Sequence, residues 1–161
     1  MSGSLHAGTG GSAHSAGHPY LVFVHGAGMD RTVWAHQARY FANHGWNVVA
    51  VDLPGHGRSA GPACTSVPAS AAALRDDLDA RGVSEAVVVG HSMGALVALV
   101  LAAEAPGRTT ALGLLGAGLA LAVNPRLLAA TEAAPERAAE AIVSWAYGRE
   151  SHLGGSQPPG A

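Results

Sequence analysis

Short apolar runs rich in β-branched residues alternate along the chain with segments that have the composition of helices. A run of four to six such residues bounded by turn residues is typical of a strand buried on both faces of a parallel sheet. Helical segments between consecutive runs supply the crossovers that parallel strands need. The pattern therefore predicts an α/β fold, with a mostly parallel sheet flanked by helices. The apolar runs are residues 20–24, 46–51, 86–89 and 110–115, and the helical segments are 31–43, 68–81 and 93–104.

The composition of the 161-residue chain agrees with one globular domain. Hydrophobic residues make up 48% of the chain and charged residues only 12%, which argues against disorder of the whole chain. Nine arginines and 11 acidic residues give a net charge of -2. No partner among nucleic acids or anionic membranes is therefore expected. The longest apolar stretch, residues 111–123, is shorter than the roughly 20 residues of a membrane-spanning helix.

Residues 1–19 differ from the rest of the chain, because they are mostly Gly, Ser, Ala and His without a hydrophobic period. This composition predicts a mobile leader, with a weak strand near Leu5 as its only regular structure. No signal peptide is expected, because the first residues contain neither a basic region nor an apolar region. No internal disulfide is expected, because Cys64 is the single cysteine. A cytoplasmic location is therefore expected. The histidines of the leader are expected in solvent, because their spacing matches no compact metal-ligand pattern. They are His6, His14 and His18.

Two segments match Gly-x-Ser-x-Gly, and their contexts distinguish them. The segment around Ser59 follows a Pro-Gly loop and opens no helix. The segment Gly90-His91-Ser92-Met93-Gly94 closes an apolar strand and starts an apolar helix, a sharp turn that exposes a serine hydroxyl at the carboxyl edge of a sheet. Gly90 and Gly94 permit the close approach of strand and helix, and the N–H groups of the helix start favour developing negative charge. Ser92 is the candidate nucleophile, expected at positive φ, with a plain helix N-cap as the alternative.

A second motif, His25-Gly26-Ala27-Gly28, directly follows the first apolar run. A backbone N–H at this position can point at the same pocket as Ser92. The motif also fits a dinucleotide-binding oxidoreductase in part, since Asp52 ends the next strand. Arg31 disfavours that alternative, because it stands where the third glycine or alanine must allow close helix packing.

A third segment, residues 52–59, is a turn-rich loop after the second strand. Its proline and glycines indicate a structural turn. His56 and Arg58 are expected in solvent.

These three motifs, in this order and spacing, resemble the α/β-hydrolase superfamily, and specifically its esterase-like members. The resemblance covers about residues 20–118. It implies Ser92 as the nucleophile, the N–H groups of Ala27 and Met93 as the oxyanion hole, a small-molecule acyl substrate and no cofactor. It also makes the helices expected at 125–134 and 135–147 the start of a cap over the pocket. The residues that support the motifs are His25, Gly26, Gly28, Gly90, His91 and Gly94.

The end of the chain departs from that family's pattern, in which the serine is followed by an acid and then by a histidine. No aspartate follows Asp79, and His152, in a Gly/Pro-rich segment, is the only histidine after His91. The glutamates between them lack a strand-to-loop context. We therefore expect the N-terminal part of a serine hydrolase, inactive alone, or else a non-catalytic binding remnant of that fold. These glutamates are Glu132, Glu136, Glu140 and Glu150.

The chain thus divides into four parts: a mobile leader at 1–19, a partial hydrolase core at 20–118, a helical start of a cap at 119–147 and a disordered tail at 148–161. Within this division the run 110–115 becomes an exposed edge of the sheet. It carries no charge to discourage strand addition. We therefore expect self-association through this edge.

Overall fold

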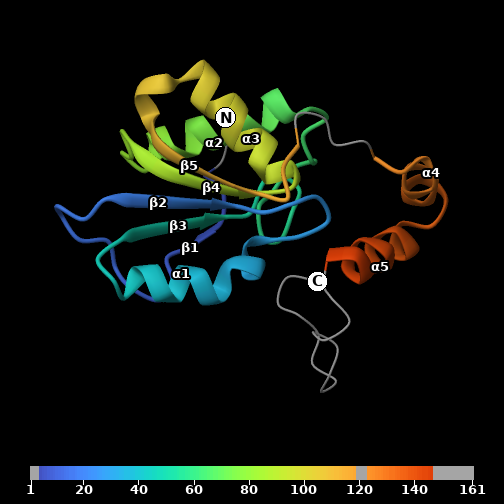
Figure 1. Cartoon of the computed structure of the whole chain (residues 1–161), viewed down its shortest axis with the longest axis horizontal. Coiled ribbons are helices and arrows are strands. Elements are labelled where there is room, and N and C mark those ends of the chain that lie inside the picture. Colours follow the sequence, from blue (N-terminus) through green and yellow to red (C-terminus); the bar gives the residue numbers. More distant parts are fainter. Residues whose placement is uncertain (1–3, 119–122, 147–161) are drawn as a thin grey trace.

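A five-stranded sheet forms the centre of the protein, as seen in a computed structural model that describes residues 4–118 and 123–146 (Figure 1). The strand order is β1-β3-β2-β4-β5. Neighbouring strands are parallel except for β1, which is antiparallel to β3. The predicted α/β fold with a mostly parallel sheet is confirmed. The strands are β1 (Ala7–Gly8), β2 (Tyr20–Val24), β3 (Asn47–Val51), β4 (Ala86–His91) and β5 (Thr109–Leu115).

Helices cover both faces of the sheet. In Figure 1, α2 and α3 lie on one face and α1 on the other, while α4 and α5 lie beyond the carboxyl ends of the strands. The 3-10 turn η1 leads into α1, and a second such turn, η2, precedes β5. The elements are η1 (Arg31–Trp34), α1 (Ala35–Ala42), α2 (Val67–Ala80), α3 (Met93–Glu104), η2 (Pro106–Arg108), α4 (Pro125–Ala133) and α5 (Pro135–Ala146).

The core has two layers, one on each face of the sheet. Along β2, Val22 and Val24 join the layer under α2 and α3, because alternate side chains of a strand point to opposite faces. Phe23 lies in the other layer and stacks on Trp34 of η1, with ring centroids 4.9 Å apart. A strand buried on both faces needs apolar residues at every position, which explains the continuous apolar runs.

Residues 4–8 pack against this core, and residues 14–18 are exposed but hydrogen-bonded to β3, which corrects the prediction of a mobile leader. Leu5 is only 7% exposed, and its N–H donates to Oδ1 of Asp77 over 2.8 Å. The short strand β1 then pairs with β3. Further along, Asn47 accepts a hydrogen bond from the N–H of Ser15 at 2.8 Å. The composition hid this packing, because one leucine and a series of backbone groups make most of these contacts.

The two helices expected after residue 118 are present as α4 and α5. The expected tail at 148–161 and residues 119–122 lie outside the described residues. In the described ranges, no helix has both the length and the apolar character needed to cross a membrane.

Candidate functional site

Ser92 lies at the junction of β4 and α3 with φ 53° and ψ -117°, and it is the one described non-glycine residue at positive φ. Such a conformation costs on the order of 1–3 kcal/mol and persists only where the surroundings fix it. Here the Ser92 N–H donates to the carbonyl of Leu115 at 2.8 Å, and its own carbonyl accepts from the N–H of Ala95 at 3.0 Å. The positive φ expected at Ser92 is confirmed.

The glycines on either side of Ser92 allow three backbone segments to meet. A methyl group on Gly90 would lie 2.2 Å from the carbonyl oxygen of Gly94. A methyl group on Gly94 would lie 2.4 Å from the carbonyl oxygen of Val24, at the end of β2. Both distances are far below van der Waals contact, so only glycine fits at these positions.

The turn after β2 lies directly against Ser92. A methyl group on Gly26 would be 3.3 Å from Cβ of Ser92 and 3.0 Å from Nδ1 of His91. The N–H of Met29 closes this turn by donating to the Gly26 carbonyl at 3.3 Å. Ala27 is exposed, and no acceptor for its N–H occurs in the part of the chain that the structure describes. The fold thus brings together the two motifs that the sequence predicted to share a pocket.

Met93 is the first residue of α3. The N–H groups in the first turn of a helix have no acceptor within that helix. The N–H of Met93 is therefore an unpaired donor at the carboxyl edge of the sheet, beside the strained backbone of Ser92 and next to the turn that carries Ala27.

His25 holds this turn in place. Its ring is fully buried, and Nε2 accepts a hydrogen bond from the N–H of Leu53 at 3.0 Å. Nδ1 therefore carries the proton and donates to the carbonyl of Gly26 at 2.8 Å. Burial lowers the pKa of His25 and keeps the ring neutral. With both nitrogens occupied, His25 supports the turn and cannot accept a proton from a neighbouring hydroxyl.

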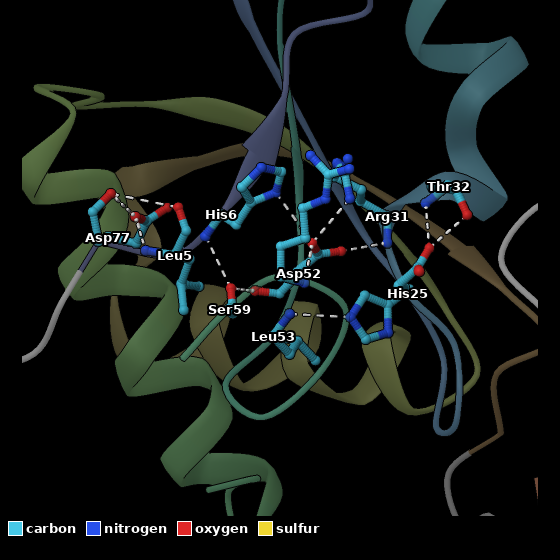
Figure 2. A network of polar contacts seen from close by, with 12 residues as sticks. Leu5, His6, His25, Arg31, Thr32, Asp52, Leu53, Ser59 and Asp77 are labelled. Atoms are coloured by element: carbon cyan, nitrogen blue, oxygen red, sulfur yellow. Dashed lines mark hydrogen bonds and ion pairs between the residues drawn. The ribbon is translucent and has the colours of Figure 1, made fainter. Parts of the chain in front are cut away.

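A buried carboxylate, Asp52, lies at the centre of the polar network in Figure 2. It accepts hydrogen bonds from the N–H of Arg31 at 2.8 Å and of Arg58 at 3.0 Å, from Nη1 of Arg31 at 3.0 Å, and lies 3.2 Å from Nδ1 of His6. Burial alone raises the pKa of Asp52, but these hydrogen bonds and the charge of Arg31 outweigh burial and lower it. The carboxylate is ionised and fully enclosed, so it cannot hold a ribose, and the dinucleotide-binding alternative is wrong.

Asp52 and Leu53 together fix both ends of one segment, residues 25–31. Leu53 binds the ring of His25 at its start, and Asp52 binds the N–H of Arg31 at its end (Figure 2). Sequence reasoning missed this role of Asp52, because its partners Arg31, Arg58 and His6 come from three separate segments of the chain. The glycine at position 57 was the one sequence signal of this packing. The structure shows why: a methyl group on Gly57 would lie 2.5 Å from the Asp52 carboxyl carbon.

The remaining predicted polar residues lie in different surroundings. His56 was expected in solvent, but it is partly packed. Its ring lies 5.0 Å from the ring of His25, and its Nδ1 is 3.0 Å from the Pro54 carbonyl oxygen. Arg58 is exposed as expected.

Burial lowers the pKa of His91. Of the glutamates considered as triad acids, those on α4 and α5 are exposed, while Glu150 and His152 lie outside the described residues.

Helix α5 lies over the turn that carries Ala27. Ala138 is 3% exposed, and Cδ1 of Ile142 is 3.1 Å from the position of a methyl group on Gly28. Helix α5 therefore contacts this turn through the apolar side chain of Ile142. Within the described ranges, no cluster of three or more potential metal ligands occurs.

Comparison with known proteins agrees with this geometry. Residues 19–148 match the model of the alpha/beta hydrolase fold family. The chain belongs to this family. It is 39% identical over 108 residues to a 2-hydroxy-6-oxononadienedioate/2-hydroxy-6-oxononatrienedioate hydrolase of Paraburkholderia phymatum. This match covers 64% of this chain and 38% of that protein. It is 38% identical over 101 residues to the lipase LipV of Mycobacterium tuberculosis, covering 63% and 38% of the two chains.

Solved structures give the same result. The chain superposes with a TM-score of 0.72 and 29% identity on Est816, described as an N-acyl homoserine lactone degrading enzyme, covering 83% of this chain and 52% of that one. The structural match therefore agrees with the family match. The chain spans between about two fifths and about half of the length of these similar proteins.

Proposed function

We propose that this α/β-hydrolase chain carries the nucleophile and the oxyanion-binding groups of a serine hydrolase that acts on esters or other acyl compounds. The observation that carries the proposal is the strained Ser92 at the end of β4, with the Gly26 turn against it. In this reaction Oγ of Ser92 attacks the acyl carbon, and the N–H groups of Ala27 and Met93 stabilise the negative oxygen that forms. The names of a lipase and of an N-acyl homoserine lactone degrading enzyme among the similar proteins support an acyl substrate.

The proton of the attacking serine must pass to a base. No described histidine is hydrogen-bonded to the Ser92 hydroxyl, and both nitrogens of His25 are occupied. No described histidine is therefore placed to act as the general base. Outside the described ranges the chain has one histidine, His152, in a Gly/Pro-rich segment, so we expect the 161-residue chain alone to turn over activated esters very slowly. Loss of a triad histidine lowers kcat by many orders of magnitude and leaves only oxyanion stabilisation and binding.

Two measurements on the purified chain test the proposal. Hydrolysis of p-nitrophenyl acetate, compared with Ser92→Ala, should show little Ser92-dependent turnover. Prolonged incubation with a fluorophosphonate, followed by peptide mass mapping, should show slow modification of Ser92. Ser59, the serine of the other Gly-x-Ser-x-Gly segment, is the internal control, because it donates to the Asp52 carbonyl at 2.6 Å and starts no helix.

Selective labelling of Ser92 over Ser59 supports the nucleophile assignment. Equal labelling of the two serines contradicts it and favours the non-catalytic binding remnant. Fast Ser92-dependent turnover instead contradicts the expected inactivity, and places a working base within the chain. In that case His152→Ala and His91→Ala identify which histidine acts.

A further inference from the structure

A hollow of about 250 Å³ lies beside Arg31, between strand β1 and helix α1, on the side of the sheet that α1 covers. Its volume is close to the lower end of the range of about 300–1,000 Å³ that small-molecule sites occupy, so it has room for a small ligand. No described acidic residue lines it. The residues around it include Gly8, Gly10, Arg31, Thr32, Ala38 and Arg39.

Arg31 has an unused edge of its guanidinium group at this hollow. Its Nη1 donates to Oδ2 of Asp52 at 3.0 Å (Figure 2). For Nε and Nη2, no acceptor occurs in the part of the chain that the structure describes. The side chain is only 18% exposed. Nε and Nη2 form the fork of parallel N–H groups that binds two oxygens of a carboxylate or a phosphate, so Arg31 has an open receptor for such a group.

Two other arginines of this chain show what that edge binds. Arg75 donates from Nε and Nη2 to the Asp76 carboxylate at 3.2 and 3.0 Å. Arg81 donates from Nε and Nη2 to the two oxygens of Asp77 at 2.7 and 3.1 Å. The same edge of Arg31 differs from these two because it lacks an acid of this chain.

The glycine of β1 leaves this edge uncovered. A methyl group on Gly8 would lie 3.4 Å from Nε and 3.6 Å from Cδ of Arg31, so a larger side chain there would cover the fork. The turn after β1 lies directly on α1, because a methyl group on Gly10 would be 2.2 Å from the carbonyl oxygen of Ala38. Backbone without side chains thus borders the hollow next to the free fork.

Arg39 of α1 supplies a second positive charge. Its side chain is exposed, and no acidic partner for it occurs among the described residues. The nearby carboxylate of Asp30 accepts hydrogen bonds from the N–H and Oγ1 of Thr32 at 2.7 and 2.6 Å and does not line the hollow. Since Asp52 offsets the charge of Arg31, the charge of Arg39 makes the hollow positive overall.

We propose that this hollow binds the phosphate group of a small molecule, between the free edge of Arg31 and the guanidinium of Arg39. A phosphate monoester has three acceptor oxygens and up to two negative charges, so it can bind both arginines at once. A carboxylate has two oxygens and one charge and satisfies one fork. The lining residues include neither Ser92 nor the Gly26 turn, so this ligand is distinct from the acyl substrate.

Titration of the whole isotope-labelled chain with methyl phosphate, followed by NMR, tests the proposal. The backbone N–H signals of Gly8, Gly10, Thr32 and Arg39 should shift and saturate. Arg39→Gln should weaken binding about tenfold, the usual effect of losing a charge-assisted hydrogen bond. Arg75→Gln is the matched control, because Arg75 is a partly exposed arginine on α2 outside the hollow. It should bind methyl phosphate like the parent chain.

Gly8→Val tests the role of Arg31 without removing a charge. Valine is compatible with a strand, and its side chain should cover the fork of Arg31 and weaken binding about as much as Arg39→Gln. Gly107→Val is its control, because nothing lies within 4 Å of a methyl group on Gly107, and it should leave binding unchanged. Signals of the sheet that keep their positions show that each variant is folded.

Four results would overturn the proposal. The first is the absence of saturable shifts around the hollow. The second is an equal loss of affinity in Arg39→Gln and Arg75→Gln, which indicates attraction of anions to any arginine. The third is unchanged binding by Gly8→Val, which removes Arg31 from the site. The fourth is binding of acetate as tight as that of methyl phosphate, which assigns the hollow to carboxylates.

Discussion

Leu53 donates its backbone N–H to Nε2 of His25 across 3.0 Å, and the same ring donates from Nδ1 to the carbonyl of Gly26. One neutral, buried imidazole thus joins the loop after β3 to the turn that lies against Ser92. A change at this ring affects both segments at once. The turn against Ser92 therefore depends on residues that are far from Ser92 in the sequence.

Replacing His25 by alanine should destabilise the fold by about 2–4 kcal/mol, because it leaves a cavity and removes the partner of a buried N–H. Urea unfolding at pH 7.5 measures the effect. The control is His44→Ala: His44 is exposed, with Nδ1 2.6 Å from the carbonyl oxygen of Tyr40, and the expected loss is below about 1 kcal/mol. Equal losses in the two variants would show that His25 does not hold the turn.

Stability should fall on mild acidification. Burial lowers the pKa of both His25 and His91 in the folded chain. Between that lowered pKa and the unfolded value of about 6.5, the unfolded state binds more protons, so the free energy of unfolding rises with pH. This contribution is fully present above about pH 6.5 and is lost as the pH falls through the folded pKa values. Urea midpoints measured from pH 7.5 to pH 5 should therefore decrease, and His91→Gln should weaken the decrease; an unchanged slope in this variant would contradict the contribution of His91.

The sequence allowed prediction of the elements whose formation depends on local pattern. Helix Met93–Glu104 and strand Tyr20–Val24 have the predicted bounds, because each is an uninterrupted apolar segment bounded by turn residues. The strained Ser92 was also predictable, since the glycines around it determine the turn. The packing of Leu5 and the contacts of Asp52 were not predictable. Leu5 bonds to Asp77, 72 positions away, and the partners of Asp52 lie 6, 21 and 46 positions away in three different segments.

Gly57 should tolerate alanine poorly, because the methyl group would lie 2.5 Å from the carboxyl carbon of buried Asp52. Gly61 is the matched control: it also has positive φ (89° against 53° for Gly57), but nothing lies within 4 Å of its methyl position. Both substitutions strain the backbone by about 1 kcal/mol or more. Gly57→Ala should cost a further 1–3 kcal/mol, roughly, for the steric conflict. Thermal melts compare the two, and equal melting temperatures would refute the enclosure of Asp52.

Asp52 should influence the reactivity of Ser92 through the turn it anchors. Asp52→Asn replaces an acceptor oxygen by a donor toward Arg31, Arg58 or His6, and should slow fluorophosphonate labelling of Ser92 several-fold relative to Ser59. Asp77→Asn is the matched control, because Asp77 is equally a buried aspartate with an arginine partner, Arg81, at 2.7 Å. It should lower stability and leave the labelling ratio unchanged. A parallel fall of the ratio in both variants would indicate general loosening rather than positioning.

The contact between Ile142 and the Gly28 turn should couple α5 to the site. Cδ1 of Ile142 lies 3.1 Å from the methyl position on Gly28, and Ala138, one turn earlier, is buried. Ile142→Asp places a charge against this apolar contact, so α5 should separate from the turn while the sheet remains folded. Hydrogen exchange should then increase in two places, the peptide of residues 135–146 and that of residues 26–31. Glu140→Ala, at an exposed position of the same helix, should leave both peptides unchanged. Faster exchange in α5 alone would mean that the helix packs on the turn without stabilising it, and the coupling would be wrong.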